Sequence, residues 1–361
     1  MQTVTVPLGE RGYDILIARG ALARLGADCA RLGLAQRCAV VTDSHVAPLL
    51  AAEAMASLGA AGFEPALIVV PAGEGSKSLR HFHQGHDQLA AHRLERKSFV
   101  VALGGGVVGD LAGFLAATHL RGLALIQVPT TLLAQVDSSV GGKVGVNLKA
   151  GKNLVGAFHQ PRLVLCDLAA LRTLPEREFR SGLAEVIKYG IIYDAALFAR
   201  LERDLTAILA RDEDVLAAIV ARCCAIKAEV VGQDETETGL RAILNFGHTI
   251  GHGLEAISGY GKYLHGEAIA IGQVAAARLS QELTGFVPAE VARVAELFAR
   301  AGLPVKVRLT TAQRGRLLAA MRQDKKVSGG EIKFVLARRL GEVVWGQKVP
   351  PALVEAVLTT A

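Results

Sequence analysis

Three histidines and one glutamate have residue types and spacing suited to a metal site. His248 and His252 lie four residues apart in the segment NFGHTIGH, and on a helix this spacing places both imidazoles on one face. His265 follows soon after, and Glu185 lies in the strongly apolar segment SGLAEVIKYGII. A catalytic zinc site commonly takes three nitrogen or carboxylate ligands and leaves one position open. These residues are therefore four candidates for three places, and spacing alone does not decide between His248 and His252.

Basic residues near these candidates could bind an anionic substrate. Lys188 lies one helical turn from Glu185 in the same apolar segment, which favours a buried pair with a role in the site over a surface salt bridge. Lys325 and Lys326 stand in a short segment, DKKV, that alone would be taken for a surface turn. Further polar candidates are Lys227, Arg241 and Asn245. This excess of cations predicts a substrate with at least two negative groups.

A glycine-rich segment in the first half could bind a dinucleotide. Gly104, Gly106 and Gly109 in LGGGVVGD fit the pattern G-x-G-x-x-G, which lets backbone amides and a helix N-terminus approach a pyrophosphate. The alternative interpretation is a tight turn between a strand and a helix. No acidic residue lies about 20 residues further on to bind a ribose. The acid at a strand end is instead Asp43, so a dinucleotide would bind in a variant α/β arrangement.

Residues 129–153 are dense in Gly, Lys, Ser and Asn. Flexible backbone donors and ammonium groups suit the recognition of phosphate or carboxylate. We expect a long irregular loop here, and such loops inside compact domains are more often functional than merely solvated.

The elements that must position these residues change character near residue 175. Before it, short β-rich runs alternate with helical segments, which predicts a mostly parallel sheet covered by helices. The expected strands are 37–42, 66–70, 98–103 and 124–128, and the expected helices between them are 46–58, 81–94 and 110–119. Later helices are expected at 196–210, 214–231, 243–257, 268–283 and 288–301, before a short β-like tail and a last helix. We therefore expect an α/β Rossmann-like domain, residues 1–175, and a mainly α-helical C-terminal domain, residues 176–361.

The composition narrows the class of protein. The chain is 51% hydrophobic and 20% charged, which is typical of a globular protein. The net charge is +6, but the basic residues are dispersed among 34 acidic residues and form no basic run, so we expect no nucleic-acid partner. Five scattered cysteines, no signal peptide and no apolar run of membrane-spanning length predict a cytoplasmic protein without a membrane partner.

Seven motifs, in order along the chain, resemble the 3-dehydroquinate synthase family. They are GGGVVGD at 104–110, PTTL at 129–132, DSSVGGK at 137–143, GKN at 151–153, AEVIK at 184–188, NFGHTIGH at 245–252 and HGE at 265–267. The resemblance implies a lyase that converts 3-deoxy-D-arabino-heptulosonate 7-phosphate to 3-dehydroquinate and phosphate, in the shikimate route to chorismate and the aromatic amino acids. The reaction would proceed by transient oxidation at C5 with NAD, phosphate elimination, re-reduction and an intramolecular aldol closure.

The resemblance also implies a role for individual residues. A divalent metal, zinc or cobalt, would be held by Glu185, His248 and His265. NAD would contact Asp43, Glu74, Lys77, Gly105, Gly106, Val107, Val108, Gly109, Asp110, Thr130, Thr131, Asp137, Lys143, Lys152 and Thr173. The phosphorylated sugar acid would meet Lys143, Asn153, Lys188, Lys227, Arg241, Asn245, His252 and one or both of Lys325 and Lys326. Arg121 would reach the phosphate site of a neighbouring subunit, which implies a homodimer.

Rival functions belong to different classes. Sibling sugar-phosphate cyclases act on sedoheptulose 7-phosphate, on glucose 6-phosphate or on an amino analogue of the heptulosonate. The dehydroquinate-synthase pattern is kept, against the first two, at Lys227, Arg241, Asn245, His252 and the turn at 324–326, whereas the amino analogue stays open. A metal-dependent polyol dehydrogenase with a similar fold would produce NADH stoichiometrically, and a non-catalytic nucleotide or metal binder would need no such set of charged residues.

Overall fold

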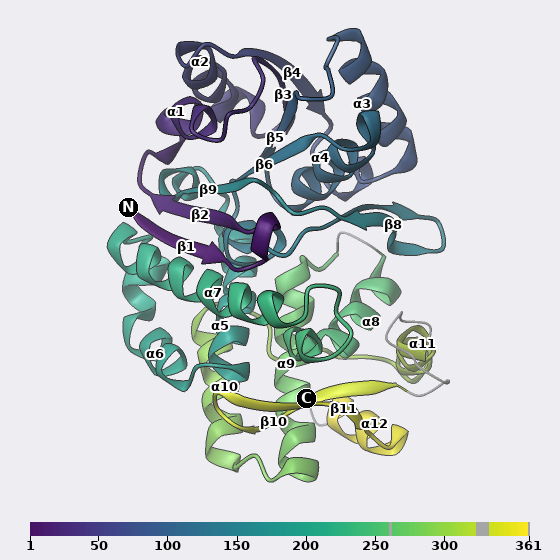
Figure 1. The fold of residues 1–361 in the computed structure, drawn as a ribbon. Coiled ribbons are helices and arrows are strands. Elements are labelled where there is room, and N and C mark those ends of the chain that lie inside the picture. Colours follow the sequence, from purple (N-terminus) through teal and green to yellow (C-terminus); the bar gives the residue numbers. More distant parts are fainter. Residues whose placement is uncertain (260–261, 323–331, 360–361) are drawn as a thin grey trace. The chain divides into compact units, whose positions relative to one another are not determined.

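The computed structural model describes residues 1–259, 262–322 and 332–359 (Figure 1). The chain divides into two compact units, residues 1–175 with 213–235 and residues 176–212 with 236–361. The first division coincides with the boundary expected near residue 175. The expectation that residues 176–361 form one continuous domain is wrong for 213–235, which belong to the first unit. Lys325 and Lys326 lie outside the described residues.

The first unit contains a sheet of seven strands in the order β1-β2-β9-β6-β5-β3-β4. All neighbouring strands pair in parallel except β1 and β2, which are antiparallel. The expected parallel sheet is confirmed, and it extends further than the sequence pattern indicated. The strands are β1 (Gln2–Val6), β2 (Tyr13–Ala18), β3 (Arg37–Asp43), β4 (Glu64–Val70), β5 (Phe99–Gly104), β6 (Ala124–Pro129) and β9 (Leu163–Asp167).

Alternate residues of the central strands pack into two separate cores. Cys38 and Val40 of β3 lie in one core with residues of α1 (Leu25–Ala30) and α2 (Ala52–Ala60). Ala39 and Val41 lie in the other with residues of α3 (Leu79–Ala91) and α4 (Gly106–Thr118). Because both faces of the sheet are covered, central strands such as β5 and β9 are buried along their whole length and consist almost entirely of apolar residues.

Residues 143–158 form a β-hairpin, β7 (Lys143–Leu148) and β8 (Gly151–Phe158), so the expectation of a long irregular loop over 129–153 is wrong here. Val144 and Val146 are buried in the same core as α4, while Lys143 is exposed. The alternation of apolar and other residues in KVGVN is the strand signal, and the richness in glycine and lysine concealed it.

Helix α7 (Glu213–Gln233) packs against β1 and β2, which places it in the first unit. Ion pairs tie both of its ends to that unit. Glu213 lies 2.8 Å from Arg172, and Glu235, just after the helix, accepts two hydrogen bonds of 2.7 Å from Arg11. Helical periodicity indicates that one face of a helix is apolar, but it does not indicate which part of the protein that face packs against.

The second unit is mainly helical, as expected. Its core contains residues of α8, α9, α11, α12 and the antiparallel pair β10–β11. The elements are α5 (Glu176–Ile192), α6 (Ala195–Leu209), η8 (Leu240–Asn245), α8 (His248–Ser258), α9 (His265–Thr284), α10 (Pro288–Arg300), α11 (Thr311–Arg322), β10 (Lys333–Arg339), β11 (Glu342–Lys348) and α12 (Pro351–Thr359). Across the described residues of both units, every helix is too short or too polar to span a membrane.

The expected helix over 243–257 is broken at Phe246 and Gly247. The 3-10 helix η8 ends at Asn245, and α8 begins at His248. Gly247 adopts a φ of +77°, and a Cβ there would lie 2.5 Å from the backbone nitrogen of Gln273. Only glycine fits this left-handed, crowded position. The break makes His248 the first residue of α8.

Candidate active site

Helix α5 carries a buried ion pair. The Glu185 side chain is 0% exposed, Lys188 is 1% exposed, and the two pair one turn apart along the helix. Burial raises the pKa of the Glu185 carboxyl, but Lys188 and His248 outweigh burial and hold this pKa well below its usual range. Glu185 is therefore an anion at neutral pH, the state in which a carboxylate binds a metal.

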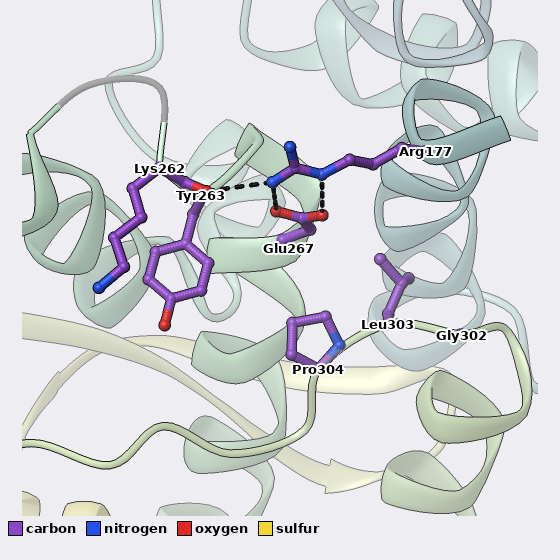
Figure 2. A pocket seen from close by; sticks show the side chains of 7 residues that line it. All are labelled: Arg177, Lys262, Tyr263, Glu267, Gly302, Leu303 and Pro304. Carbon is purple, nitrogen blue, oxygen red and sulfur yellow. Dashed lines mark hydrogen bonds and ion pairs between the residues drawn. The ribbon is translucent and has the colours of Figure 1, made fainter. Parts of the chain in front are cut away.

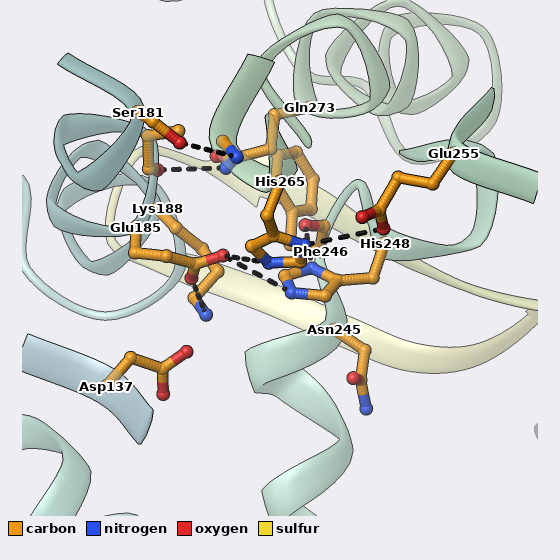
Figure 3. Close-up of polar contacts among 12 residues, drawn as sticks. Asp137, Ser181, Glu185, Lys188, Asn245, Phe246, His248, Glu255, His265 and Gln273 are labelled. Carbon is orange, nitrogen blue, oxygen red and sulfur yellow. Dashed lines mark hydrogen bonds and ion pairs between the residues drawn. The ribbon is translucent and has the colours of Figure 1, made fainter. Parts of the chain in front are cut away.

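Two histidines direct ring nitrogens at the same carboxylate (Figure 3). The Nε2 atoms of His248 and His265 lie 3.4 Å and 3.3 Å from Oε1 of Glu185. The ligand atoms of the three residues all lie within 4.8 Å of one another. Nδ1 of His248 lies 3.1 Å from the carbonyl oxygen of Phe246, to which it can donate, and this leaves Nε2 as the basic nitrogen. The set of two nitrogens and one oxygen matches a catalytic zinc site.

Close packing of α5 against α9 brings Glu185 beside His265. A Cβ on Gly266 would lie 1.8 Å from the backbone oxygen of Ser181, and the Ser181 hydroxyl accepts a 3.0 Å hydrogen bond from the Gly266 amide. One turn further along α5, the side-chain amide of Gln273 donates to the carbonyl oxygen of Ala184 at 3.0 Å. The helices thus meet just before Glu185 on α5 and just after His265 on α9.

A bidentate ion pair fixes the start of α9. Arg177 donates to both carboxylate oxygens of Glu267 at 2.7 Å and 2.8 Å, and to the carbonyl oxygen of Lys262 at 3.0 Å (Figure 2). Glu267 also accepts a 2.9 Å hydrogen bond from the amide of Leu264. A pocket of about 510 Å³ is lined by Arg177, Lys262, Tyr263, Glu267, Gly302, Leu303 and Pro304. The pair joins the N-terminal ends of α5 and α9, which are two of the three helices that carry the candidate ligands.

A second group of metal donors shares His265. Its members are His252, Glu255 and His265, whose ligand atoms also lie within 4.8 Å of one another. Burial lowers the pKa of His265, but hydrogen bonds and charge from Glu185 and Glu255 outweigh it and raise this pKa to about 9. Among the described residues, neither donor group contains both His248 and His252, although their ring centroids are only 5.3 Å apart.

The other substrate candidates of the second unit are Arg241, Asn245 and His252. Arg241 is 2% exposed, and Asn245 donates a 2.8 Å hydrogen bond to Glu237. Glu237 and Glu255 were not predicted from the sequence. Glu255 carried a signal, because it lies seven residues after His248 and therefore on the same face of α8. Glu237, in a polar turn, carried none.

The predicted nucleotide-binding residues lie at the carboxyl ends of adjacent parallel strands in the first unit. Asp43 ends β3, Gly105 follows β5, and Thr130 follows β6. In open α/β sheets ligands bind at this edge. Gly105 is the N-cap of α4 without a side-chain cap, so the amides of the first turn, which includes Val107 and Val108, are oriented toward the edge. A Cβ on Gly105 would lie 3.0 Å from the Thr131 methyl group.

Polar side chains around this edge are already paired with the protein. Burial raises the pKa of Asp110, although an ion pair with Lys77 opposes the rise. Glu74 accepts a 2.7 Å hydrogen bond from Asn147. One oxygen of Asp43 accepts from the amides of His45 and Val46, and the hydroxyls of Thr131 and Thr173 bond to nearby backbone.

The substrate candidates of the first unit and the NAD candidate Lys152 come from α7 and the hairpin. Lys227, 5% exposed, pairs with the carboxylate of Asp137. Lys143, Lys152 and Asn153 lie on the hairpin, and Asn153 adopts a φ of +54° while its amide donates to the side-chain oxygen of Asn147 at 2.8 Å.

Arg121 lies apart from the nucleotide edge. It is exposed, has a φ of +71°, and follows the C-terminal end of α4, whereas Gly106 begins that helix. A helix of 13 residues is about 20 Å long, so Arg121 is separated by that length from the glycine-rich turn of its own chain.

Comparisons with known proteins agree with this geometry. Residues 67–181 match the domain described as "3-dehydroquinate synthase N-terminal", and residues 182–327 match "3-dehydroquinate synthase C-terminal". The 3-dehydroquinate synthase of Pelobacter propionicus is 52% identical over 345 residues, which cover 95% of each chain.

Two solved structures are similar along the whole chain. One is 2-epi-5-epi-valiolone synthase from Streptomyces hygroscopicus with NAD+ and Zn2+ bound, with a TM-score of 0.88, 29% identity and 96% of each chain covered. The other is 2-deoxy-scyllo-inosose synthase complexed with carbaglucose-6-phosphate, NAD+ and Co2+, with a TM-score of 0.89, 26% identity and 99% of this chain and 100% of that chain covered. Since both of its domains match and half of its residues are shared with a relative of equal extent, the chain belongs to the 3-dehydroquinate synthase family.

Proposed function

We propose that this chain converts 3-deoxy-D-arabino-heptulosonate 7-phosphate to 3-dehydroquinate and phosphate, with NAD and a divalent metal as cofactors. The buried group Glu185, His248 and His265, in a chain of this family, is the observation that carries the proposal. A phosphorylated sugar substrate and these cofactors also accord with the NAD+, metal and carbaglucose-6-phosphate bound by the two similar structures. The reaction makes the protein a carbon–oxygen lyase of the shikimate route, and its five buried, unbridged cysteines support a reducing, cytoplasmic location.

The metal would be held by one carboxylate oxygen and two imidazole nitrogens. The donor set fits zinc or cobalt, because its atoms already lie close together and Glu185 is anionic. When bound, the metal supplies a Lewis acid that polarises the C5 hydroxyl of the substrate. Lys188 balances the charge of Glu185 and would also hold an anionic group of the substrate.

NAD would lie along the carboxyl ends of β3, β5 and β6. When bound, it supplies a hydride acceptor at C5 that later returns the hydride. The first-turn amides of α4 would hold its pyrophosphate, with Thr130 and Thr131 beside them. Asp43 stands at the end of β3, where a ribose hydroxyl would meet a carboxylate, and Lys77 and Asp110 would contact NAD as one pair.

Cationic side chains would hold the substrate's carboxylate and phosphate. Arg241 is buried, and a buried guanidinium favours a bidentate anion. Lys143, Lys188 and Lys227 supply further ammonium groups, while Asn153 and Asn245 supply amide donors. His252 would move a proton at a ring nitrogen, because it lies beside the metal group without belonging to the first set of ligands. These contacts stabilise the negative charge that develops as phosphate leaves.

We also propose a homodimer in which Arg121 serves the phosphate site of the neighbouring subunit. Its distance along α4 from the glycine-rich turn supports this proposal, since it does not reach the nucleotide edge of its own chain.

Turnover with a trace of NAD tests the function. Purified protein with heptulosonate 7-phosphate and substoichiometric NAD should release many equivalents of phosphate, without accumulation of NADH, and a chelator should stop the release. Stoichiometric NADH would indicate a polyol dehydrogenase. Parallel assays with sedoheptulose 7-phosphate, glucose 6-phosphate and the amino analogue separate the sibling cyclases, and preference for any of them over the heptulosonate would contradict the proposal.

A further inference from the structure

His265 presents both of its ring nitrogens to carboxylates. Nε2 lies 3.3 Å from Glu185 on α5, and Nδ1 lies 3.4 Å from Glu255 on α8 (Figure 3). The Glu255 side chain is 6% exposed, so its charge is withdrawn from water and needs a partner. Neither the motifs of the sequence nor the proposed ligand set assigns Glu255 a role.

The chemistry of imidazole determines which nitrogen of His265 can bind a metal in this arrangement. A neutral ring has one protonated nitrogen and one basic nitrogen, and only the basic nitrogen can bind a metal. A carboxylate that accepts the Nδ1–H proton selects the tautomer whose Nε2 is basic, and it also fixes the plane of the ring. Nε2 is the nitrogen of His265 that faces Glu185.

We propose that Glu255 is a positioning residue that holds His265 in the tautomer and orientation needed to bind the metal. The inference deepens the proposed metal site and rests on it. The carbonyl oxygen of Phe246 fixes the tautomer of His248 in the same way, since it lies 3.1 Å from Nδ1 of that ring. Both histidine ligands thus have an acceptor behind the ring, one neutral and one charged.

A second metal site is the competing interpretation of the same residues. It would consist of His252, Glu255 and His265 and would use Nδ1 of His265. One neutral ring cannot give a lone pair to two cations, so this group excludes the first unless the ring loses its last proton. The first group contains Glu185, which is 0% exposed and surrounded by positive partners, whereas His252 in the second group is only partly buried. The observations therefore favour one metal, with Glu255 behind its ligand.

Metal titration of the full chain tests the proposal. Protein stripped by a chelator is titrated with Zn2+ against a chromophoric chelator, and with Co2+ while its visible absorption is recorded. Glu255→Ala should weaken affinity about 10–100-fold and change the Co2+ spectrum, at an unchanged stoichiometry of one metal per chain. Glu255→Gln, whose neutral amide oxygen still accepts the Nδ1–H proton, should recover part of the loss.

Two further variants make the result decisive. Glu202→Ala removes a carboxylate of the same unit that pairs with Arg293, and it should leave metal affinity unchanged. Glu185→Ala should abolish binding; retained binding there means that the proposed metal site itself is wrong. Wild-type affinity in a folded Glu255→Ala protein overturns the positioning role. So does a result in which the wild-type protein binds two metals per chain and Glu255→Ala loses only one of them. Folding is checked by thermal unfolding and by NAD binding.

Discussion

The carboxylate of Glu185 and the ammonium of Lys188 form an ion pair that is almost wholly withdrawn from solvent, with side chains 0% and 1% exposed. Taking one partner from such a pair leaves an uncompensated charge, which costs about 3–5 kcal/mol. Lys188→Met should therefore lower the free energy of unfolding of chelator-treated protein by about 3 kcal/mol. The loss should be smaller with Zn2+, whose charge then balances Glu185. Urea unfolding with and without chelator measures both, and the exposed Lys306→Met is the control.

The two histidines of NFGHTIGH should differ in what their loss removes. His248→Ala should lose metal and activity together, because its Nε2 belongs to the donor group of Glu185. His252→Ala should keep the metal at near wild-type affinity and lose turnover. Metal content by elemental analysis and phosphate release measure the two effects, and metal loss from both variants would restore the paired-ligand interpretation.

Metal affinity should depend steeply on pH. The pKa of His265 is raised to about 9 before a metal binds, so the ring is protonated below that pH and a metal must displace its proton. The apparent affinity should therefore fall about tenfold per pH unit as the pH decreases from 9 toward 7. Competition titrations at three pH values measure the slope. A flat profile would mean that His265 is neutral in this range or is not a ligand.

The glycine at the N-terminus of α4 should be needed for the cofactor. Gly105→Ala places a methyl group 3.0 Å from the side chain of Thr131, against the edge where a pyrophosphate would bind. We expect NAD affinity to fall at least about tenfold, roughly 1.4 kcal/mol, while metal affinity is unchanged. Gly59→Ala is the matched control, because α2 has open space at that position. Calorimetric titration with NAD distinguishes them, and equal affinities would contradict the proposed cradle.

Complementation tests the role of Arg121 in a neighbouring subunit. Arg121→Ala and Glu185→Ala should each be inactive alone. In a randomly mixed population of dimers half are mixed, and one of the two sites in each mixed dimer receives both native residues. Co-expression should thus recover about a quarter of wild-type activity. Recovery of none would place Arg121 in the site of its own chain, and an active Arg121→Ala protein would place it outside any site.

The layout of the chain was predictable where local chemistry determines it. The apolar strands of the sheet, the turn at Gly105 and the buried pair on α5 follow from short-range patterns, and the motifs contain the three residues that the structure groups as possible metal donors. Features set by distant partners were not predictable. The break at Gly247 depends on the backbone of Gln273, and the contact of Glu255 with Nδ1 of His265 depends on how α8 packs against α9. Lys143–Leu148 forms a strand because Val144 and Val146 pack into a core, and the glycines of this region gave no indication of that packing.

The placement of α7 determines how this protein can be divided. The chain passes from one unit to the other three times, at residues 175/176, 212/213 and 235/236. No single cut therefore yields two complete halves. A fragment that ends at residue 175 lacks the helix that covers β1 and β2, and it also lacks Lys227. Separate expression of a nucleotide-binding half would require residues 213–235 to be joined to it by a new linker.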